Sequence, residues 1–401
     1  MASDPVVSSA SRRSFLSLSA AASAAFALRI VTEPMLAAAA RNQWPHDGVL
    51  INANENPLGP SAAAREAVAG IVAQGGRYCD WLTEDLTNEL ARQVGLKPEY
   101  VCVYPGSTPP LNHSVGAFCS PQRSYVTADP GFEAGMYAAE GVKARVVKVP
   151  LAKDYSHDVH AMLAAGADAG LFYICNPNNP TGTITSHSDI EYLVANKPKD
   201  AIVLVDEAYI HFSDAAPVLD LVKADRDVLV LRTFSKIYGM AGLRCGAIFG
   251  RPDLLDRVET YGGMNFMPIT ALAAASASLK DAQLVAERRR INAEIRSRVF
   301  GWLDHNGYSY VPSQSNCFML DTKRAGKEVI DAMAKQNVHI GRIWPVWPTY
   351  VRITVGTAPE MEQFQTALKK VMTGAVTASA RSPRTSPSGR KGRRGELAVR
   401  A

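Results

Sequence analysis

The sequence has no C-x-x-C pair and, beyond its first 40 residues, no apolar run long enough to cross a membrane. Its six cysteines are scattered, and each lies in or beside an apolar run, as buried free thiols do. These absences argue against a disulfide framework and against a cysteine-ligated metal site. We therefore expect no metal centre and no stable membrane insertion.

A large charge of one sign is also missing from the body of the chain. The net charge of +5 arises in the tail, where residues 376–401 carry seven basic residues and one acidic residue. The remaining body is close to neutral, so composition gives no reason to expect nucleic-acid binding. The tail is rich in Ser, Pro, Gly and Arg and is predicted to be disordered. A contact of this tail with nucleic acid or anionic lipid is the less favoured alternative.

The first 40 residues contain paired arginines followed by a mildly apolar, alanine-rich stretch. The segment SRRSFLS and the later MLAAAA resemble a twin-arginine export signal with small residues at cleavage-like spacing. We expect a signal peptide over 1–40 and export, to the periplasm for example. If the leader is only a poorly ordered helix, the protein stays in the cytoplasm.

The body alternates short apolar runs with helical segments. VCVY, SYVTADP, ARVVKVP, GLFYICN, AIVLVDEAY, DVLVLRTFS and RCGAIFG are expected strands. Continuous apolar runs of this length are typical of a mostly parallel sheet covered on both faces. We predict an α/β fold with a large domain over 77–285. The arm 41–76 and residues 286–375 are expected to form a smaller α/β domain.

Polar and charged residues follow several of these expected strands. GST (106–108), NPNNPTG (176–182) and VDEAYIHF (205–212) lie at strand ends, where open α/β sheets bind ligands. Taken singly, each has a structural alternative: a strand–turn–helix junction, a rigid turn, or a surface strand end. Arg352, on a later strand, either forms a buried ion pair or binds a substrate carboxylate.

Lys236 and Arg244 place two cations in one apolar neighbourhood. Burying an amine is costly unless a partner or a shifted pKa compensates. An anion should therefore lie nearby, and Arg244 with Ser235 and the amides near Ser107 could hold a phosphate. A lysine, a phosphate site, an acid and a phenol together suit pyridoxal phosphate, which needs a lysine for its aldehyde and an Asp for its ring nitrogen.

At this point the sequence resembles a known family. The motifs NANENPLGPS, RYCD, NPNNPTGT, VDEAYIHF, RTFSKIYGMAGLRCG and YVRITVG run from about residue 50 to 370. They are similar to those of fold-type I pyridoxal-phosphate aminotransferases of the histidinol-phosphate aminotransferase branch. The resemblance implies that Lys236 bonds to the cofactor and later moves the substrate proton.

The resemblance also implies roles for the other motif residues. Asp206 would pair with the ring nitrogen, while Asn179 and Tyr209 would hydrogen-bond the ring oxygen. Phe132 would stack on the ring, and Tyr78 would reach the phosphate of a partner subunit, which implies a homodimer with shared sites. The phosphate would be held by Ser107, Thr108, Ser235 and Arg244. Substrate-binding residues would be Arg352, Arg342, Asn56 and Trp344.

Two segments depart from the family pattern. Pro109 and Pro110 follow the Gly-Ser turn, where many members have an acidic residue, and they change the entry to the helix. In VHIGRIWPVWPTYVRITVG, Trp344 and Trp347 would form an aromatic wall, unless both simply pack in the small domain. Such a wall suits an aromatic or cationic side chain better than a phosphate.

The favoured function is transfer of an amino group from an L-amino acid to a 2-oxo acid. The same cofactor and fold also support a decarboxylase, a cyclase or an oxygen-using oxidase or deaminase, since the fold does not fix which bond at Cα breaks. A non-catalytic pyridoxal-phosphate-binding regulator is a remote alternative. It would need a DNA-binding module, and the first 50 residues contain no helix-turn-helix candidate.

Overall fold

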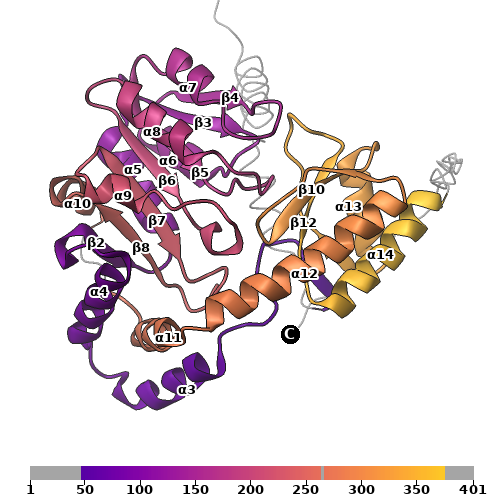
Figure 1. Ribbon diagram of the computed structural model, residues 1–401, viewed down its shortest axis with the longest axis horizontal. Helices are drawn as coiled ribbons and strands as arrows, with labels where there is room; N and C mark the ends of the chain where they lie inside the picture. The colour runs from indigo at the N-terminus through magenta and orange to yellow at the C-terminus, as the bar shows by residue number, and fades with distance from the viewer. Residues whose placement is uncertain (1–46, 263–265, 375–401) are drawn as a thin grey trace, which may run out of the picture.

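A computed structural model describes residues 47–262 and 266–374 of the chain. It has a larger and a smaller α/β unit, joined by a long helix (Figure 1). The signal peptide expected over 1–40 and the tail expected over 376–401 lie outside the described residues. Within the part of the chain that is described, no helix is both long and apolar enough for a membrane span.

The larger unit is built on a seven-stranded sheet in the order β2-β8-β7-β6-β5-β3-β4. Neighbouring strands are parallel except at β8, which is antiparallel to both β2 and β7. This confirms the predicted mostly parallel sheet. The strands are β2 (Val101–Tyr104), β3 (Ser124–Asp129), β4 (Val146–Pro150), β5 (Ala169–Cys175), β6 (Ile202–Asp206), β7 (Val228–Thr233) and β8 (Gly246–Gly250).

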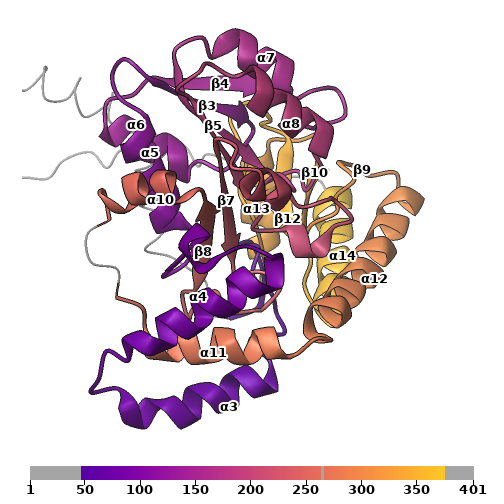
Figure 2. The ribbon, with the colours of Figure 1, turned by 60° about the vertical axis from the view of Figure 1, so that its left-hand side comes forward.

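Helices cover both faces of this sheet, and α5 and α6 lie on the opposite side from α8 (Figure 2). Every residue of β5 and β6 is buried as a result, which explains why these strands are continuous apolar runs rather than alternating ones. The helices are α4 (Asp80–Val94), α5 (Thr108–Phe118), α6 (Ala134–Gly141), α7 (Val159–Ala165), α8 (His187–Asn196), α9 (Leu219–Lys223), α10 (Pro252–Glu259) and α11 (Ile269–Lys280).

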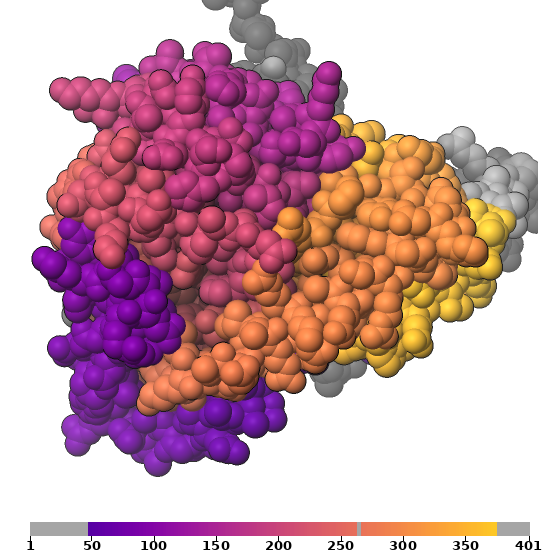
Figure 3. All heavy atoms as spheres, in the orientation of Figure 1, coloured from indigo at the N-terminus to yellow at the C-terminus, as the bar shows by residue number. Residues whose placement is uncertain are grey.

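The smaller unit has its own hydrophobic core. Its antiparallel sheet has the order β12-β10-β9, and a separate parallel pair joins β1 to β11. The strands are β1 (Val49–Ile51), β9 (Ser309–Tyr310), β10 (Cys317–Asp321), β11 (Val338–Ile340) and β12 (Tyr350–Thr354). Its helices are α12 (Leu284–His305), α13 (Gly326–Ala334) and α14 (Ala358–Thr373). In Figure 3, the orange surface around α12 adjoins that of the larger unit.

The arm over 41–76, which we expected in the smaller domain, is divided between the two units where it is described. Strand β1 pairs with β11 of the smaller unit, whereas helix α3 (Ala62–Ile71) packs on α11 of the larger one. Ala64 is fully buried there, and Val68 packs against the same large core. The chain between β1 and α3 therefore crosses from one unit to the other, and it passes the site described next.

Candidate active site

The site lies where the carboxyl ends of the central strands meet the smaller unit. Asp206 ends β6, Lys236 follows β7, and Asn179 follows β5. Arg352 comes from β12 of the smaller unit, and its Nη1 donates to Asn179 Oδ1 at 2.9 Å. Four of the residues named from sequence are thus brought to the sheet edge where α/β folds bind ligands.

Lys236 is a half-buried residue, and its amine has no carboxylate partner among the described residues. Its Nζ donates to the backbone oxygen of Asn54 at 3.0 Å and lies 5.4 Å from the centre of the Tyr209 ring. Burial lowers the pKa of this amine to about 8, and the charge of Arg352 acts in the same direction. A buried lysine of lowered pKa is suited to nucleophilic attack and to proton transfer.

Two neighbouring carboxylates at the end of β6 have different partners. Glu207 Oε2 accepts from Arg232 Nε at 2.9 Å, in a largely buried ion pair. Asp206 instead accepts hydrogen bonds from the hydroxyl of Tyr173 (2.8 Å) and the amide of Ala208 (3.1 Å). Burial raises the pKa of Asp206 to about 6. Asp206 is therefore the carboxylate left to stabilise a cation supplied by a ligand.

Arg244 lies beside the amino end of α5. Its Nη1 donates to Ala241 O at 2.9 Å and approaches Ser235 Oγ at 3.4 Å. Among the described residues it has no acidic partner. Gly106 is required here, because its φ is +92° and a Cβ would come within 2.1 Å of Arg244 Nη2. A guanidinium without a carboxylate partner, set against a helix N-terminus, is suited to binding a phosphate.

The entry to α5 contains the prolines that depart from the family pattern. The helix begins at Thr108, so Pro109 and Pro110 fall in its first turn, where a missing N–H costs little. Ser107 precedes the helix and makes no capping hydrogen bond through its side chain. The two prolines are thus accommodated, with Ser107 and Thr108 still at the turn beside Gly106.

Asn54, which the sequence analysis did not single out, is central to the site. Besides accepting from Lys236, it donates through Nδ2 to the hydroxyl of Tyr209 (3.1 Å) and to Cys317 Sγ (3.1 Å). It lies in the NANENPLGPS motif, where Asn56 was preferred. Asn56 donates instead to the backbone oxygen of Ile237 at 3.0 Å. The motif was visible in the sequence, but only the chain path decides which of its asparagines faces the lysine.

Arg352 is buried and uses only part of its hydrogen-bonding capacity. Nη1 and Nη2 donate to Asn179 Oδ1 and to the backbone oxygen of Asn52 (2.8 Å), while Nε is buried and has no hydrogen-bond partner among the described residues. Burial lowers its pKa from the usual arginine value. An incompletely satisfied buried guanidinium next to Lys236 fits a substrate carboxylate.

The two tryptophans of the departing segment pack in one small hydrophobic cluster, with Val311 and Met319. Trp344 is 2% exposed, and its Nε1 donates to Gly131 O at 2.9 Å. Its ring lies 4.6 Å from the guanidinium carbon of Arg342 and 5.7 Å from that of Arg352. Trp347 contacts the rings of Tyr155 and Tyr350. Of the two rings, that of Trp344 is the one that lies beside Arg342 and Arg352.

Two further aromatic residues were named from sequence. Phe132 is half-buried and packs against the large core. Tyr78 is 71% exposed and stacks on Phe266 with ring centres 4.9 Å apart. Its hydroxyl makes no hydrogen bond to the described residues of this subunit, and its contact with a partner subunit stays a prediction.

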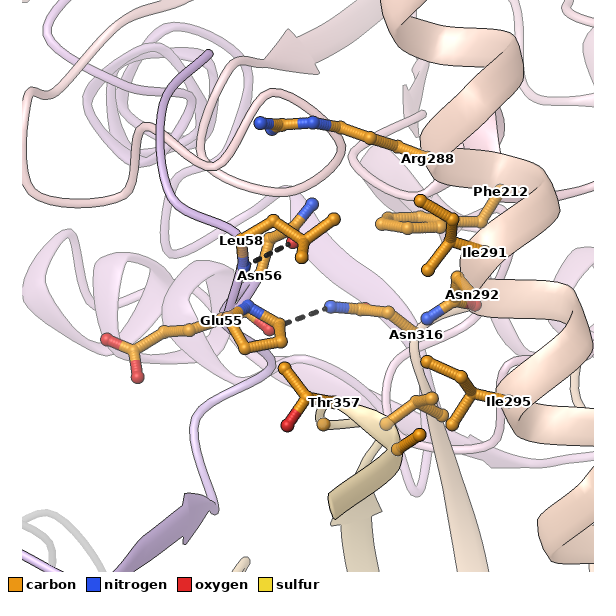
Figure 4. Close-up of a pocket in the computed structure, with 14 residues that line it drawn as sticks. Glu55, Asn56, Leu58, Phe212, Arg288, Ile291, Asn292, Ile295, Asn316 and Thr357 are labelled. Atoms are coloured by element: carbon orange, nitrogen blue, oxygen red, sulfur yellow. Dashed lines mark hydrogen bonds between the residues drawn. The ribbon is translucent and has the colours of Figure 1, made fainter. Parts of the chain in front are cut away.

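A cavity of about 190 Å³ lies beside residues 55–58, the segment that follows Asn54 (Figure 4). Figure 4 shows the side chain of Asn316 pointing at the backbone of Glu55, to whose oxygen its Nδ2 donates at 3.4 Å. Phe212 and residues of α12 such as Ile291 and Ile295 line the opposite side. This mostly apolar cavity is lined by Asn56, which was expected to bind substrate, but by none of the phosphate-binding or lysine groups.

The residues fit pyridoxal phosphate. The cradle formed by Gly106 and Arg244 suits the phosphate, the buried Asp206 suits a cationic ring nitrogen, and the amine of Lys236 suits the aldehyde. Arg244 approaches Ser235, which directly precedes Lys236, and the charge of Lys236 acts on Asp206, so these groups lie in one region at the sheet edge. Fold and site together define a fold-type I pyridoxal-phosphate-dependent transferase.

Comparisons with known proteins identify the family. Residues 46–370 match the model of the family "Aminotransferase class I and II". A histidinol-phosphate aminotransferase of Symbiobacterium thermophilum is 35% identical over 82% of this chain and 91% of its own. One of Moorella thermoacetica is 34% identical over 81% and 86%. The chain belongs to the class I and II aminotransferase family and is a pyridoxal-phosphate-dependent, histidinol-phosphate aminotransferase-like enzyme.

A solved structure agrees with this assignment. The histidinol-phosphate aminotransferase of Sinorhizobium meliloti, determined in complex with pyridoxal-5′-phosphate, superposes with a TM-score of 0.74 at 27% identity. The match covers 80% of this chain and 90% of that one. The predictions of the fold, the cofactor and the enzyme class are confirmed.

We expect the cofactor-free protein to capture pyridoxal phosphate at a rate that rises with pH, with a midpoint near 8. Only the neutral amine attacks an aldehyde, and burial lowers the pKa of Lys236 from 10.5 to about 8, so the reactive fraction grows as pH rises through 8. Stopped-flow absorbance measures this rate. Arg352→Gln removes a neighbouring cation and should move the midpoint upward. A midpoint near 10.5 in the unaltered protein would contradict the expectation.

Proposed function

We propose that the enzyme moves the amino group of an aromatic or cationic L-amino acid to a 2-oxo acid. The observation that carries the proposal is the buried, incompletely satisfied guanidinium of Arg352 beside the amine of Lys236. Binding of the α-carboxylate by Arg352 would orient Cα toward Lys236. The ring of Trp344, which contacts Arg352, supports an aromatic or cationic side chain over a phosphate.

Each residue of the site would have a separate role in the reaction. Pyridoxal phosphate, when bound, supplies an electron-withdrawing ring conjugated to the substrate's Cα. Lys236, once its amine is released, moves the proton from Cα as a general base. The charge of Asp206 keeps the ring nitrogen protonated, and Arg244 with Ser235 anchors the phosphate. The buried surroundings exclude water and strengthen each of these electrostatic contacts.

A screen of amino donors without an acceptor tests this function. The holoenzyme mixed with one amino acid should convert one equivalent to the 2-oxo acid and stop as pyridoxamine phosphate. Turnover that continues only with oxygen would instead indicate an oxidase or deaminase. Release of carbon dioxide would indicate a decarboxylase, and a ring-closed product would indicate a cyclase.

Replacing Arg352 with alanine should raise KM for the amino donor more than it lowers kcat. The bidentate contact with the α-carboxylate is lost in both the ground state and the transition state, so its removal weakens binding uniformly. We expect KM to rise about 10²-fold, corresponding to about 3 kcal/mol. Steady-state kinetics measure both parameters. An unchanged KM would place the carboxylate site elsewhere.

We further propose a homodimer with shared active sites. Support comes from exposed aromatic residues near the start of α4, since Tyr78, Trp81 and Phe266 are each about half exposed or more. Large exposed aromatic side chains gathered in one region are typical of subunit interfaces. Light scattering should give twice the subunit mass. A monomer that retains full activity would overturn the proposal.

We propose export through the twin-arginine pathway on the basis of the segment SRRSFLS. A reporter that is active only outside the cytoplasm, fused after residue 46, measures this directly. Replacing Arg12 and Arg13 with lysine should abolish the exported signal. Equal signals from both fusions would indicate a cytoplasmic enzyme.

A further inference from the structure

The loop that follows β11 contacts the segment that follows β3, across the boundary between the two units. Arg342 Nη2 donates to Glu133 Oε2, and Trp344 Nε1 donates to Gly131 O at 2.9 Å. Residues more than 200 positions apart in the sequence are thereby joined. Glu133 directly follows Phe132, the residue expected to stack on the cofactor. The ion pair is therefore next in the chain to the position expected to face the cofactor.

The position of this pair next to Arg352 rests on two observations. The guanidinium carbons of Arg342 and Arg352 lie 4.6 Å and 5.7 Å from the ring of the same Trp344. Burial raises the pKa of Glu133, while the charges of Arg342 and Arg352 act in the opposite direction. The carboxylate is thus within electrostatic reach of the group that we expect to bind the α-carboxylate of the substrate.

The two partners are unequally exposed. The side chain of Glu133 is 13% exposed, whereas that of Arg342 is 41% exposed. The carboxylate is therefore held inside the site, while the guanidinium can still be approached from solvent. Arg342 has no second acidic partner among the described residues, so Glu133 alone neutralises it.

We propose that Glu133 is a specificity-determining residue, which neutralises Arg342 and so disfavours amino donors whose side chain carries a carboxylate or a phosphate. The proposal rests on the aminotransferase function proposed above. It narrows the proposed donors by disfavouring acidic and phosphorylated side chains relative to aromatic ones.

The physical reason is the cost of a second anion. An acidic side chain could bind Arg342 only by displacing Glu133 or by sharing the guanidinium with it. Displacement leaves a mostly buried carboxylate unpaired, and sharing places two like charges side by side. An uncharged aromatic side chain requires neither and gains contact area on the apolar surfaces nearby.

The variant Glu133→Gln tests the proposal, because it removes the charge while keeping the shape and an acceptor for Arg342. In the holoenzyme, kcat/KM for L-glutamate divided by kcat/KM for L-phenylalanine should rise about tenfold or more. The corresponding ratio of histidinol phosphate to L-phenylalanine should rise as well. Glu133→Asp keeps the charge and should leave both ratios low. Glu294→Gln, at an exposed ion pair on α12, controls for the change in net charge.

A binding measurement makes the test independent of turnover. Calorimetry with the unaltered holoenzyme should show 3-phenylpropionate binding about tenfold more tightly than glutarate. Glu133→Gln should reduce or reverse this preference. Tighter binding of glutarate by the unaltered enzyme would overturn the proposal, even if the variant failed to fold.

The failures of the two proposals are distinguishable. If the enzyme converts amino donors in the half-reaction but Glu133→Gln leaves every ratio unchanged, the ion pair is only a structural contact between the units, and the specificity proposal is overturned. If no amino donor forms pyridoxamine phosphate while 3-phenylpropionate is still preferred to glutarate, the proposed function fails and the specificity of the pocket stands.

Discussion

Replacing Lys236 with alanine should abolish covalent capture of pyridoxal phosphate and reduce the half-reaction rate by about 10⁴-fold or more. The variant loses both the amine that bonds to the aldehyde and the base that moves the substrate proton. Its absorbance should be that of free rather than lysine-bound cofactor, and borohydride should fix no pyridoxyl group at position 236. Absorbance, mass spectrometry of the reduced protein and single-turnover kinetics provide the measurements.

A second buried lysine gives a matched control. The side chain of Lys197 is 5% exposed and forms an ion pair at 2.9 Å with Asp227, which precedes the amino end of β7, whereas Lys236 follows its carboxyl end. Lys197→Ala should lower the free energy of unfolding but leave cofactor capture intact. Addition of a small primary amine should partly restore proton transfer to Lys236→Ala. Full turnover in Lys236→Ala without added amine would refute the role given to this residue.

Replacing Asp206 with asparagine should lower the half-reaction rate by about 10²–10³-fold, the usual effect of losing a preorganised electrostatic group. The amide fills the same space beside Tyr173 and Ala208 but carries no charge. The ring nitrogen would lose its proton, and electron withdrawal from Cα would weaken. Stopped-flow absorbance of the half-reaction gives the rate, and equilibrium titration gives the accompanying loss of cofactor affinity.

The adjacent carboxylate supplies the control for Asp206. Glu207→Gln makes the same change of charge one residue along the chain, but it breaks the buried pair with Arg232. Removing one partner of such a pair costs about 3–5 kcal/mol of stability. The rate per folded molecule should be retained. If Asp206→Asn and Glu207→Gln slowed the half-reaction equally, the result would contradict the role assigned to Asp206.

Much of the fold was predictable because the composition of each short segment indicates whether it forms a buried strand. The seven strands of the central sheet are short apolar runs, and burial on both faces requires that composition in interior strands such as β5 and β6. Polar residues at strand ends, such as Asn179, Asp206 and Lys236, could be assigned to one edge because parallel strands end together. The order of the strands and the division of the 41–76 arm were not predictable in this way.

The contact partner of each site residue could not be derived from the sequence. Asp206 and Glu207 are neighbours with the same chemistry, and only the approach of Arg232 separates a structural carboxylate from one available to the cofactor. Asn54 and Asn56 lie in one motif, and the path of the chain selects Asn54 for Lys236. Trp344 and Trp347 pack in one cluster, but only the fold places the ring of Trp344 beside Arg342 and Arg352.

By itself the sequence determined the sheet, the lysine and the residues that a phosphate-bearing aromatic aldehyde requires, since each depends on residue type and on position relative to a strand end. The tertiary structure alone decided the contacts that bear on substrate choice, such as Glu133 with Arg342 and Arg352 with Asn179. These pairs join residues of the two units that are about 170 to 210 positions apart. The strength of an electrostatic interaction depends on the distance between the two groups in space, and separation along the chain does not predict that distance.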